Sequence, residues 1–443
     1  MRNEFRKFKV KQLLRSSAMV AIGLTTGLSL ASCSSSPKQG SSAPQTSAAF
    51  PKVTSAQNAS ARKAFYVVPS DLRSAPAGSL IRSQQVTGLA GVPKDSKVWR
   101  IMFHSRTIYN KDIAQSGYAM LPSGRKPTGG YPTIAWAHGT SGFSAPCGPS
   151  WFDASGPSGL YLVPQLGSYL SAGFAIAAAD YQGLGISQGI HPYLLGLSEG
   201  RSVLDASRAT QELARGELSK KVIIYGHSQG GHAALFAGEI APRYAPDLQI
   251  AGVVAAAPAT GMSTLISVVS SDIGAGFMPF SIPTAWAWST TYKDLPSSSL
   301  FTPAGITFAK TAISKGCSSE VGRAITQAKL TPATVFSSKA SSNPVVMAHA
   351  KLNDPGRVKT NFPMLIIQGT ADGTVPPALT DSFVSSAACP IGDRVEYLHA
   401  VGADHGSVVF VSAPKVLSWM QDRLSGIAAT TTCGQPGDAS NLP

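Results

Sequence analysis

The chain has 443 residues, of which 43% are hydrophobic and only 14% are charged. This is ample apolar material for a large core, and the length allows two or three domains. The formal net charge is +14, but six basic residues and one acidic residue within the first 15 account for +5 of it. The remaining charge is scattered, without a basic run interleaved with aromatic residues, so we expect no nucleic-acid partner.

The N-terminal segment, residues 1–32, has the organisation of an export signal. A basic stretch precedes an apolar stretch at 16–30 that is too short to span a bilayer comfortably. Leu30-Ala31-Ser32-Cys33 follows, and a small-residue cleavage site that ends at a cysteine is typical of bacterial lipoproteins. We therefore expect cleavage before Cys33, lipidation of its thiol and a location on the outer face of the cell membrane. An ordinary signal peptide and a secreted protein are the alternative.

Residues 33–62 are rich in Ser, Ala, Pro and Gln, which predicts a flexible tether between membrane and domain. Four further cysteines follow it: Cys147, Cys317, Cys389 and Cys433. Four cysteines in an exported chain indicate two disulfides, and three pairings are open. Their spacing does not resemble that of metal ligands, so we expect no metal site.

The order of predicted elements indicates the fold class. In chain order, we expect paired strands at 98–109 and 115–121, then strands at 133–137, 174–179, 221–225, 250–256, 364–368 and 395–399, and helices at 198–215, 229–240 and 413–424. Short apolar strands that alternate with helices predict an α/β fold, with a mostly parallel sheet covered by helices on both faces.

The stretch at 261–359 breaks this alternation. It holds an apolar, aromatic group amid many Ser, Thr and Pro residues: Phe277, Met278, Phe280, Trp286 and Trp288. We interpret it as a cap inserted between two strands of a core formed by 63–260 and 360–433, with a C-terminal tail at 434–443. A helical decoration without a role at the site is the alternative.

A nucleophile is predicted where the strand at 221–225 runs into Gly226-His227-Ser228-Gln229-Gly230 and a helix follows. A strand that turns sharply into a helix forces strained backbone geometry on the central residue, which only small neighbours tolerate. The side chain of Ser228 would then project at the carboxyl edge of the sheet, above the partial positive charge of a helix N-terminus. We identify Ser228 as the nucleophile of a serine hydrolase.

Serine needs a base to take its proton, and the base needs a third group to orient it. In a fold of this kind the acid and then the histidine follow later strands. Asp372 comes just after the strand at 364–368, and His405 follows the last strand. Asp404 is a rival acid, but adjacent side chains on one loop point apart, so we assign Asp372.

An oxyanion hole needs two backbone N–H donors. Gln229, the residue after the nucleophile, supplies one, and the loop after the strand at 133–137 should supply the other. We assign Thr140, with Gly139 as the alternative. The remaining histidines near these motifs are interpreted as packing or hydrogen-bonding groups: His138, His191, His227 and His232.

At this point the chain resembles the secretory lipases related to the yeast lipase A, of the α/β-hydrolase superfamily. The resemblance covers about residues 65–433 and is strongest between the oxyanion strand and the nucleophile. Its motifs are Phe65-Tyr66, Leu80-Ile81-Arg82, Asp180-Tyr181-Gln182-Gly183-Leu184-Gly185, His191-Pro192-Tyr193-Leu194, Ser198-Glu199-Gly200-Arg201-Ser202-Val203-Leu204-Asp205 and Gly369-Thr370-Ala371-Asp372.

The resemblance implies a hydrolase of fatty-acyl or shorter esters, with a cap between the sixth and seventh core strands. It also implies disulfides that join Cys147 to Cys317 and Cys389 to Cys433. Two features depart from the family. The lipoprotein-like Cys33 is not general in it, and the cap has no motif that matches, so the acyl chain length is open.

We therefore expect acyl transfer to Ser228 and release by water, with a lipid or small-ester substrate, no cofactor and no obligate protein partner. Transfer to, or deacylation of, envelope glycolipids is the alternative, and a peptidase is less favoured. An inactive binding lipoprotein would need a damaged triad, whereas all three members are present. We expect the acyl chain to lie against four aromatic residues of the cap: Phe277, Phe280, Trp286 and Trp288.

Overall fold

The computed structural model describes residues 59–153, 161–187, 189–313, 316–433 and 437–438, and these belong to one compact unit, Val53–Pro443. The predicted signal peptide, Cys33 and the tether up to residue 58 lie outside the described residues. Among the residues that are described, no helix is both long enough and apolar enough to cross a membrane.

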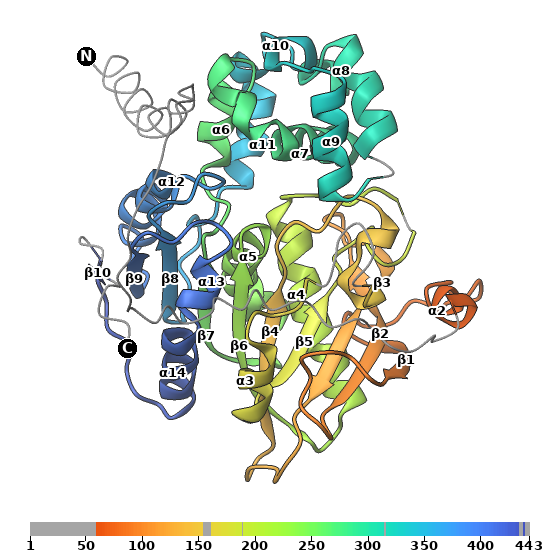
Figure 1. Ribbon diagram of the computed structural model, residues 1–443, viewed down its shortest axis with the longest axis vertical. Coiled ribbons are helices and arrows are strands. Elements are labelled where there is room, and N and C mark those ends of the chain that lie inside the picture. Colours follow the sequence, from red (N-terminus) through yellow and green to blue (C-terminus); the bar gives the residue numbers. More distant parts are fainter. Residues whose placement is uncertain (1–58, 154–160, 188, 314–315, 434–436, 439–443) are drawn as a thin grey trace, which may run out of the picture. The chain divides into compact units, whose positions relative to one another are not determined.

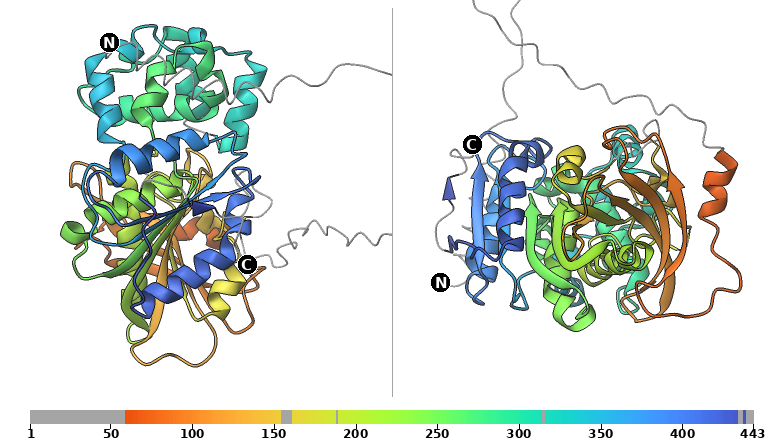
Figure 2. Two further views of the ribbon diagram at one scale, coloured as in Figure 1. Left: turned by 90° about the vertical axis from the view of Figure 1, so that its left-hand side faces the viewer. Right: turned by 90° about the horizontal axis from the view of Figure 1, so that it is seen from below.

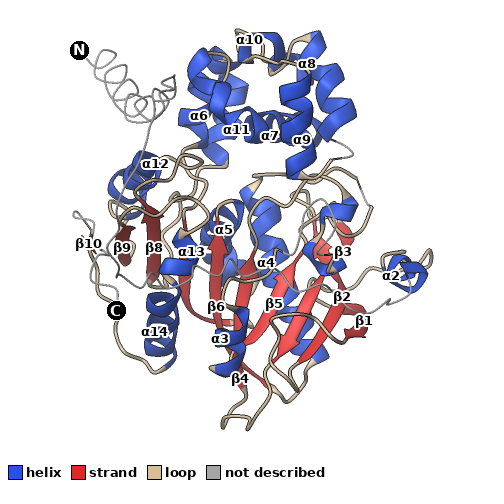
Figure 3. Cartoon of the chain, in the orientation of Figure 1, coloured by secondary structure: helices blue, strands red, loops and turns tan. Residues whose placement is uncertain are grey.

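The described residues form a ten-stranded sheet in the order β1-β2-β3-β5-β4-β6-β7-β8-β9-β10 (Figures 1 and 3). The first three strands and the β3–β5 pair are antiparallel, and all later pairs are parallel. The bounds are β1 Leu80–Val86, β2 Lys97–Arg106, β3 Asp112–Leu121, β4 Tyr131–Ala137, β5 Ala175–Ala179, β6 Leu218–His227, β7 Gln249–Ala256, β8 Met364–Gly369, β9 Val395–Ala400 and β10 Gly437–Asp438.

Helices cover both faces of the sheet, as the alternating pattern predicts (Figure 2). One buried cluster joins the strands to α4, α5 and α12, and a second joins them to α3, α13 and α14. The bounds are α3 Leu166–Ser171, α4 Gly196–Leu213, α5 Gln229–Tyr244, α12 Pro377–Phe383, α13 Val408–Val411 and α14 Ala413–Leu424. Every predicted strand and helix is present, with ends that lie within four residues of those expected.

Two elements near the start of the domain were not predicted. Helix α2, Ala59–Phe65, begins inside the predicted tether, because Phe65 and the following Tyr66 are buried in a small cluster with Met102. Strand β1 has a mostly half-buried pattern, since it lies at the edge of the sheet and pairs with β2 alone. Neither segment has a strong apolar periodicity.

Between β7 and β8 the chain forms a helical insertion, residues 262–352, which lies beyond the carboxyl ends of the strands (Figure 1). It has a buried cluster of its own that includes Ile282, Trp288 and Phe336. Its α-helices are α6 Met262–Val268, α7 Met278–Thr291, α8 Pro303–Phe308, α9 Ser318–Gln327, α10 Pro332–Val335 and α11 Pro344–Leu352.

The described residues contain two disulfides, with the pairing that the family resemblance implies. Cys147, in the loop after β4, is bonded to Cys317, the N-cap of α9, and thereby ties the core to the helical insertion. Cys389 is bonded to Cys433 and fastens the C-terminal segment beside β9. There the backbone N–H of Thr432 donates to the carbonyl of Val395 over 2.8 Å.

Candidate active site

Ser228 occupies a sharp turn between β6 and α5, with φ 60° and ψ −120°. This conformation is strained for a residue with a side chain, and the packing around it explains the flanking glycines. A Cβ atom on Gly226 would lie 1.9 Å from the carbonyl oxygen of Gly230, and one on Gly230 would lie 1.8 Å from that of Ala137. Glycine is therefore required at both positions for the turn to close.

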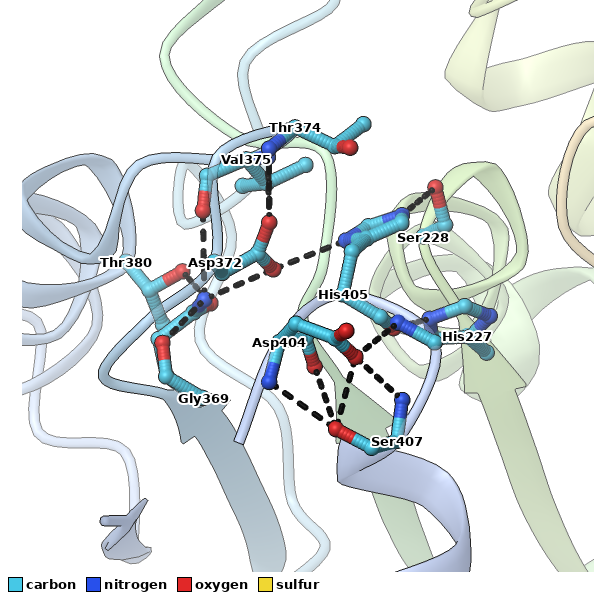
Figure 4. A network of polar contacts seen from close by, with 12 residues as sticks. His227, Ser228, Gly369, Asp372, Thr374, Val375, Thr380, Asp404, His405 and Ser407 are labelled. Atoms are coloured by element: carbon cyan, nitrogen blue, oxygen red, sulfur yellow. Dashed lines mark hydrogen bonds and ion pairs between the residues drawn. The ribbon is translucent and has the colours of Figure 1, made fainter. Parts of the chain in front are cut away.

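The loops after β8 and β9 bring two further side chains to Ser228 (Figure 4). Nε2 of His405 lies 2.9 Å from Oγ of Ser228, and Nδ1 of His405 lies 2.7 Å from Oδ2 of Asp372. A buried carboxylate accepts a hydrogen bond, which assigns the ring proton to Nδ1. Nε2 then carries a lone pair directed at the serine hydroxyl.

The carboxylate of Asp372 is buried and fully hydrogen-bonded. Its Oδ1 accepts from the backbone N–H groups of Thr374 and Val375, each over 2.8 Å, and its Oδ2 also accepts from Nε2 of Gln368 over 3.0 Å. Hydrogen bonds to the charged form offset the cost of burying it. These contacts fix the carboxylate in one orientation toward His405.

Asp404 has a different task, although it precedes His405 in the chain. Its exposed carboxylate accepts from the backbone N–H groups of Gly406 (3.1 Å) and Ser407 (2.7 Å) and from the hydroxyl of Ser407 (2.6 Å). The bonds from Ser407 lower the pKa of Asp404 below its usual value. Asp404 closes its own turn, and the imidazole of His405 is bonded to Asp372 instead.

His227 is a hydrogen-bonding group, in line with its interpretation from sequence, and its two partners come from distant segments. Its Nε2 donates to the backbone carbonyl of His405 over 2.8 Å, and its Nδ1 accepts from the hydroxyl of Tyr161 over 2.8 Å. Burial lowers the pKa of His227 to about 3, so the ring is neutral. It connects the residue before the nucleophile to the loop that carries His405.

The other histidines are buried hydrogen-bonding groups, in line with their interpretation from sequence. His138 lies between the carbonyls of Gly139 and Asp180, and burial lowers its pKa to about 4. His191 contacts the carbonyl of Gln182, and burial lowers its pKa to about 3. Neither ring is hydrogen-bonded to Ser228.

The candidate oxyanion donors come from two segments, since Gln229 directly follows Ser228 and Thr140 lies in the loop after β4. Within the described part of the chain, the backbone N–H groups of Gln229 and Thr140 have no backbone partner, whereas that of Gly139 is hydrogen-bonded to the side chain of Tyr161. The side chain of Gln229 donates to buried Glu199 over 2.8 Å, and Oγ1 of Thr140 lies 2.7 Å from the hydroxyl of Tyr193. These side-chain contacts hold both loops while leaving the amides available to a ligand.

Glu199, which holds Gln229, is itself held at three points. Besides Nε2 of Gln229, it accepts from the backbone N–H of Leu194 and from Nδ1 of His232, each over 2.8 Å. His232 completes the network through the carbonyl of Asn353, over 2.9 Å. Glu199 of α4 therefore holds the first residue of α5, the helix that follows Ser228.

A narrow apolar cavity of about 60 Å³ reaches Ser228 from the helical insertion. Three of the four expected aromatic residues line it: Phe277, Phe280 and Trp288. Trp286 does not, and that expectation is corrected. Trp286 and Trp288 are separated by two positions on α7, which corresponds to a rotation of about 200° around the helix, so their indoles point to different sides. Trp286 instead packs edge-on against Phe301, with ring centroids 6.4 Å apart.

Residues 161–432 match the family model described as secretory lipase. Lipase A of Moesziomyces aphidis is 24% identical over 195 residues, which are 42% of this chain and 41% of that protein. A probable inactive lipase of Mycobacterium tuberculosis is 24% identical over 395 residues, covering 82% of each chain.

Among solved structures, Candida antarctica lipase A in its closed state superposes with a TM-score of 0.70 and 19% identity, over 85% of this chain and 88% of that one. This likeness confirms the predicted α/β-hydrolase fold. Since the family model spans more than half of the sequence, the chain belongs to the secretory lipase family.

Proposed function

We propose that this protein is an exported serine ester hydrolase that cleaves lipid esters through an acyl-enzyme on Ser228. Membership of the secretory lipase family supports a lipid ester hydrolase and supports export. The observation that carries the finer proposal is the hydrogen-bonded chain from Ser228 through His405 to Asp372, at the end of an apolar cavity.

In the first half of the reaction, Oγ of Ser228 attacks the ester carbonyl while Nε2 of His405 takes its proton. Asp372 stabilises the imidazolium that forms, because its buried carboxylate is already oriented toward Nδ1. The tetrahedral oxygen carries the developing negative charge, and the backbone N–H groups of Gln229 and Thr140 are the donors that we assign to it.

In the second half, His405 gives its proton to the leaving alcohol, and the acyl group remains bonded to Ser228. Water then enters, His405 takes one of its protons, and the acid is released as the serine hydroxyl is restored. The proton transfers between Ser228 and His405 join atoms that lie 2.9 Å apart.

We further propose that the helical insertion acts as a cap whose cavity holds the acyl chain. Ser228 lines the cavity, whereas His405 does not. Since the leaving oxygen must come within hydrogen-bond reach of His405 to be protonated, the alcohol should depart on that side. The acyl chain is then left to the apolar side, toward Phe280 and Trp288.

A mechanism-based label tests the catalytic proposal. A fluorophosphonate should add to wild-type protein at Ser228, located by peptide mass spectrometry, and should not label Ser228→Ala. Rates on p-nitrophenyl esters from two to sixteen carbons should then define the preferred chain. A wild-type protein that neither reacts with the label nor hydrolyses any of these esters would instead be an inactive relative.

Anchoring is a separate proposal, because Cys33 lies outside the described residues. If Cys33 is lipidated, Cys33→Ala should move the protein from the membrane fraction to the medium without changing its specific activity. Since acyl chains contribute about 0.8 kcal/mol per buried CH₂, losing them should release nearly all of the protein. Retention of the variant in the membrane fraction would contradict lipidation as the anchor.

A further inference from the structure

Two hydroxyl groups inside the apolar cavity lack a hydrogen-bond partner. Thr260 is 0% exposed, and neither its Oγ1 nor the buried Oγ of Ser281 is bonded to any described residue. Both residues line the cavity that Ser228 closes. A third hydroxyl in the same cavity behaves differently, since Oγ1 of Thr284 donates to the carbonyl of Phe280 over 2.8 Å.

Other buried hydroxyls of the described residues also lack a partner, such as that of Thr133, but Thr260 and Ser281 are the ones that line the cavity. Leaving a buried hydroxyl unpaired forfeits the hydrogen bonds that it made to water. A purely hydrocarbon chain in this cavity would exclude water and leave both oxygens unpaired. A ligand with a polar group at the level of Thr260 and Ser281 would form hydrogen bonds with these hydroxyls.

Thr260 lies at the nucleophile end of the cavity. The residue before it, Ala259, donates its backbone N–H to the carbonyl of Ser228 over 3.0 Å. Ser281 belongs to α7 in the helical insertion. The remaining wall is largely hydrocarbon, with Met262, Leu265, Ile266, Val269 and Leu379. A polar group that reaches Thr260 must therefore be close to the ester carbonyl, with an apolar chain beyond it.

We infer that the preferred substrate is an ester of a hydroxyacyl chain, with the hydroxyl within a few bonds of the ester carbonyl, where Thr260 binds it. A hydroxyl suits this place because it can donate to or accept from the threonine hydroxyl. The inference rests on the proposed function, since it assigns the acyl chain to this cavity. Because Thr260 approaches from one fixed side, one enantiomer of the hydroxyacyl ester should be favoured.

The test compares kcat/KM for ethyl octanoate with kcat/KM for each enantiomer of ethyl 3-hydroxyoctanoate. Hydrolysis is measured through the acid that it releases. One enantiomer should be preferred over the plain ester by about tenfold or more, the effect expected when a site built for a hydrogen bond is offered an analogue without it. In Thr260→Val, which keeps the shape and removes the hydroxyl, this ratio should fall to near one.

The controls use the same cavity. Thr284→Val removes a hydroxyl that already has a partner, so the ratio should stay as in wild type, and Thr260→Ser should restore the ratio that Thr260→Val loses. No preference for either enantiomer in the wild type, or an unchanged ratio in Thr260→Val, would overturn the inference while leaving the ester hydrolase intact. If none of the three esters is hydrolysed, the proposed function itself is contradicted.

Discussion

The triad and the cavity beside it differ in whether their buried polar atoms have hydrogen-bond partners. Asp372 accepts four hydrogen bonds, and both ring nitrogens of His405 have partners. In the cavity, the hydroxyls of Thr260 and Ser281 have none among the described residues. The polar groups of the first region are paired within the protein, whereas those of the second leave room for a partner that a ligand would supply.

The largest effect is expected when the hydroxyl of Ser228 is removed from the triad. Ser228→Ala should lower kcat/KM by about 10³-fold or more, because only the oxyanion donors and substrate binding remain. Esterase assays at equal protein concentration check this, with the melting temperature as the control for folding. Turnover near the wild-type value would contradict the assignment of Ser228.

The two aspartates beside His405 form a matched pair. Asp372→Asn should lower kcat by about 10²- to 10⁴-fold, because an amide can no longer hold Nδ1–H in place and stabilise the imidazolium. Asp404→Asn should change kcat by less than about threefold, because its carboxylate serves only the turn to Ser407. A greater loss in Asp404→Asn than in Asp372→Asn would show that Asp404 is the catalytic acid.

The two tryptophans of α7 sharpen the contrast inside the insertion. Trp288→Ala should enlarge the cavity and shift the preferred p-nitrophenyl ester to longer chains, because each matched methylene contributes about 0.8 kcal/mol, or close to fourfold in affinity. Trp286 lies outside the cavity, so Trp286→Ala should lower the melting temperature without shifting the preferred length of the ester chain. Equal profiles for the two variants would place the acyl chain elsewhere.

The smallest expected effect lies outside both regions, at Glu239 on α5, which accepts from the backbone N–H of Gly356. Burial raises the pKa of Glu239 from 4.5 to about 7. The folded state therefore binds this proton more tightly than the unfolded state, so stability falls as the pH rises from about 4.5 through 7.

Glu239→Gln keeps the acceptor and removes the titration. Its melting temperature should exceed that of wild type by about 1–3 °C at pH 8, and the difference should vanish at pH 4. Thermal melts across this range check the sign. A wild-type protein that is the more stable of the two at pH 8 would show that the charged form is favoured in the fold.

Much of the core and the triad could be predicted because their signals are local. The apolar strand before Ser228, the flanking glycines and the helix after it lie within about 25 consecutive residues, and each agrees with the others. Asp372 and His405 each follow a strand whose buried pattern is continuous. Parallel strands end at one edge, so residues far apart in sequence could be expected to meet there.

The rest was decided by packing between segments. Trp286 and Trp288 are equally apolar in sequence, and only the direction from which Phe301 and the cavity approach α7 separates them. Nothing near Thr260 indicates a missing partner, since a hydroxyl is satisfied or not by atoms from other elements. Asp404 and His227 received their partners in the same way. Sequence by itself determined the fold class and which side chains follow the strands at Ser228, Asp372 and His405. Tertiary structure decided which side chains line the cavity and which polar groups are paired, because contacts between distant elements do not appear in the periodicity of the sequence.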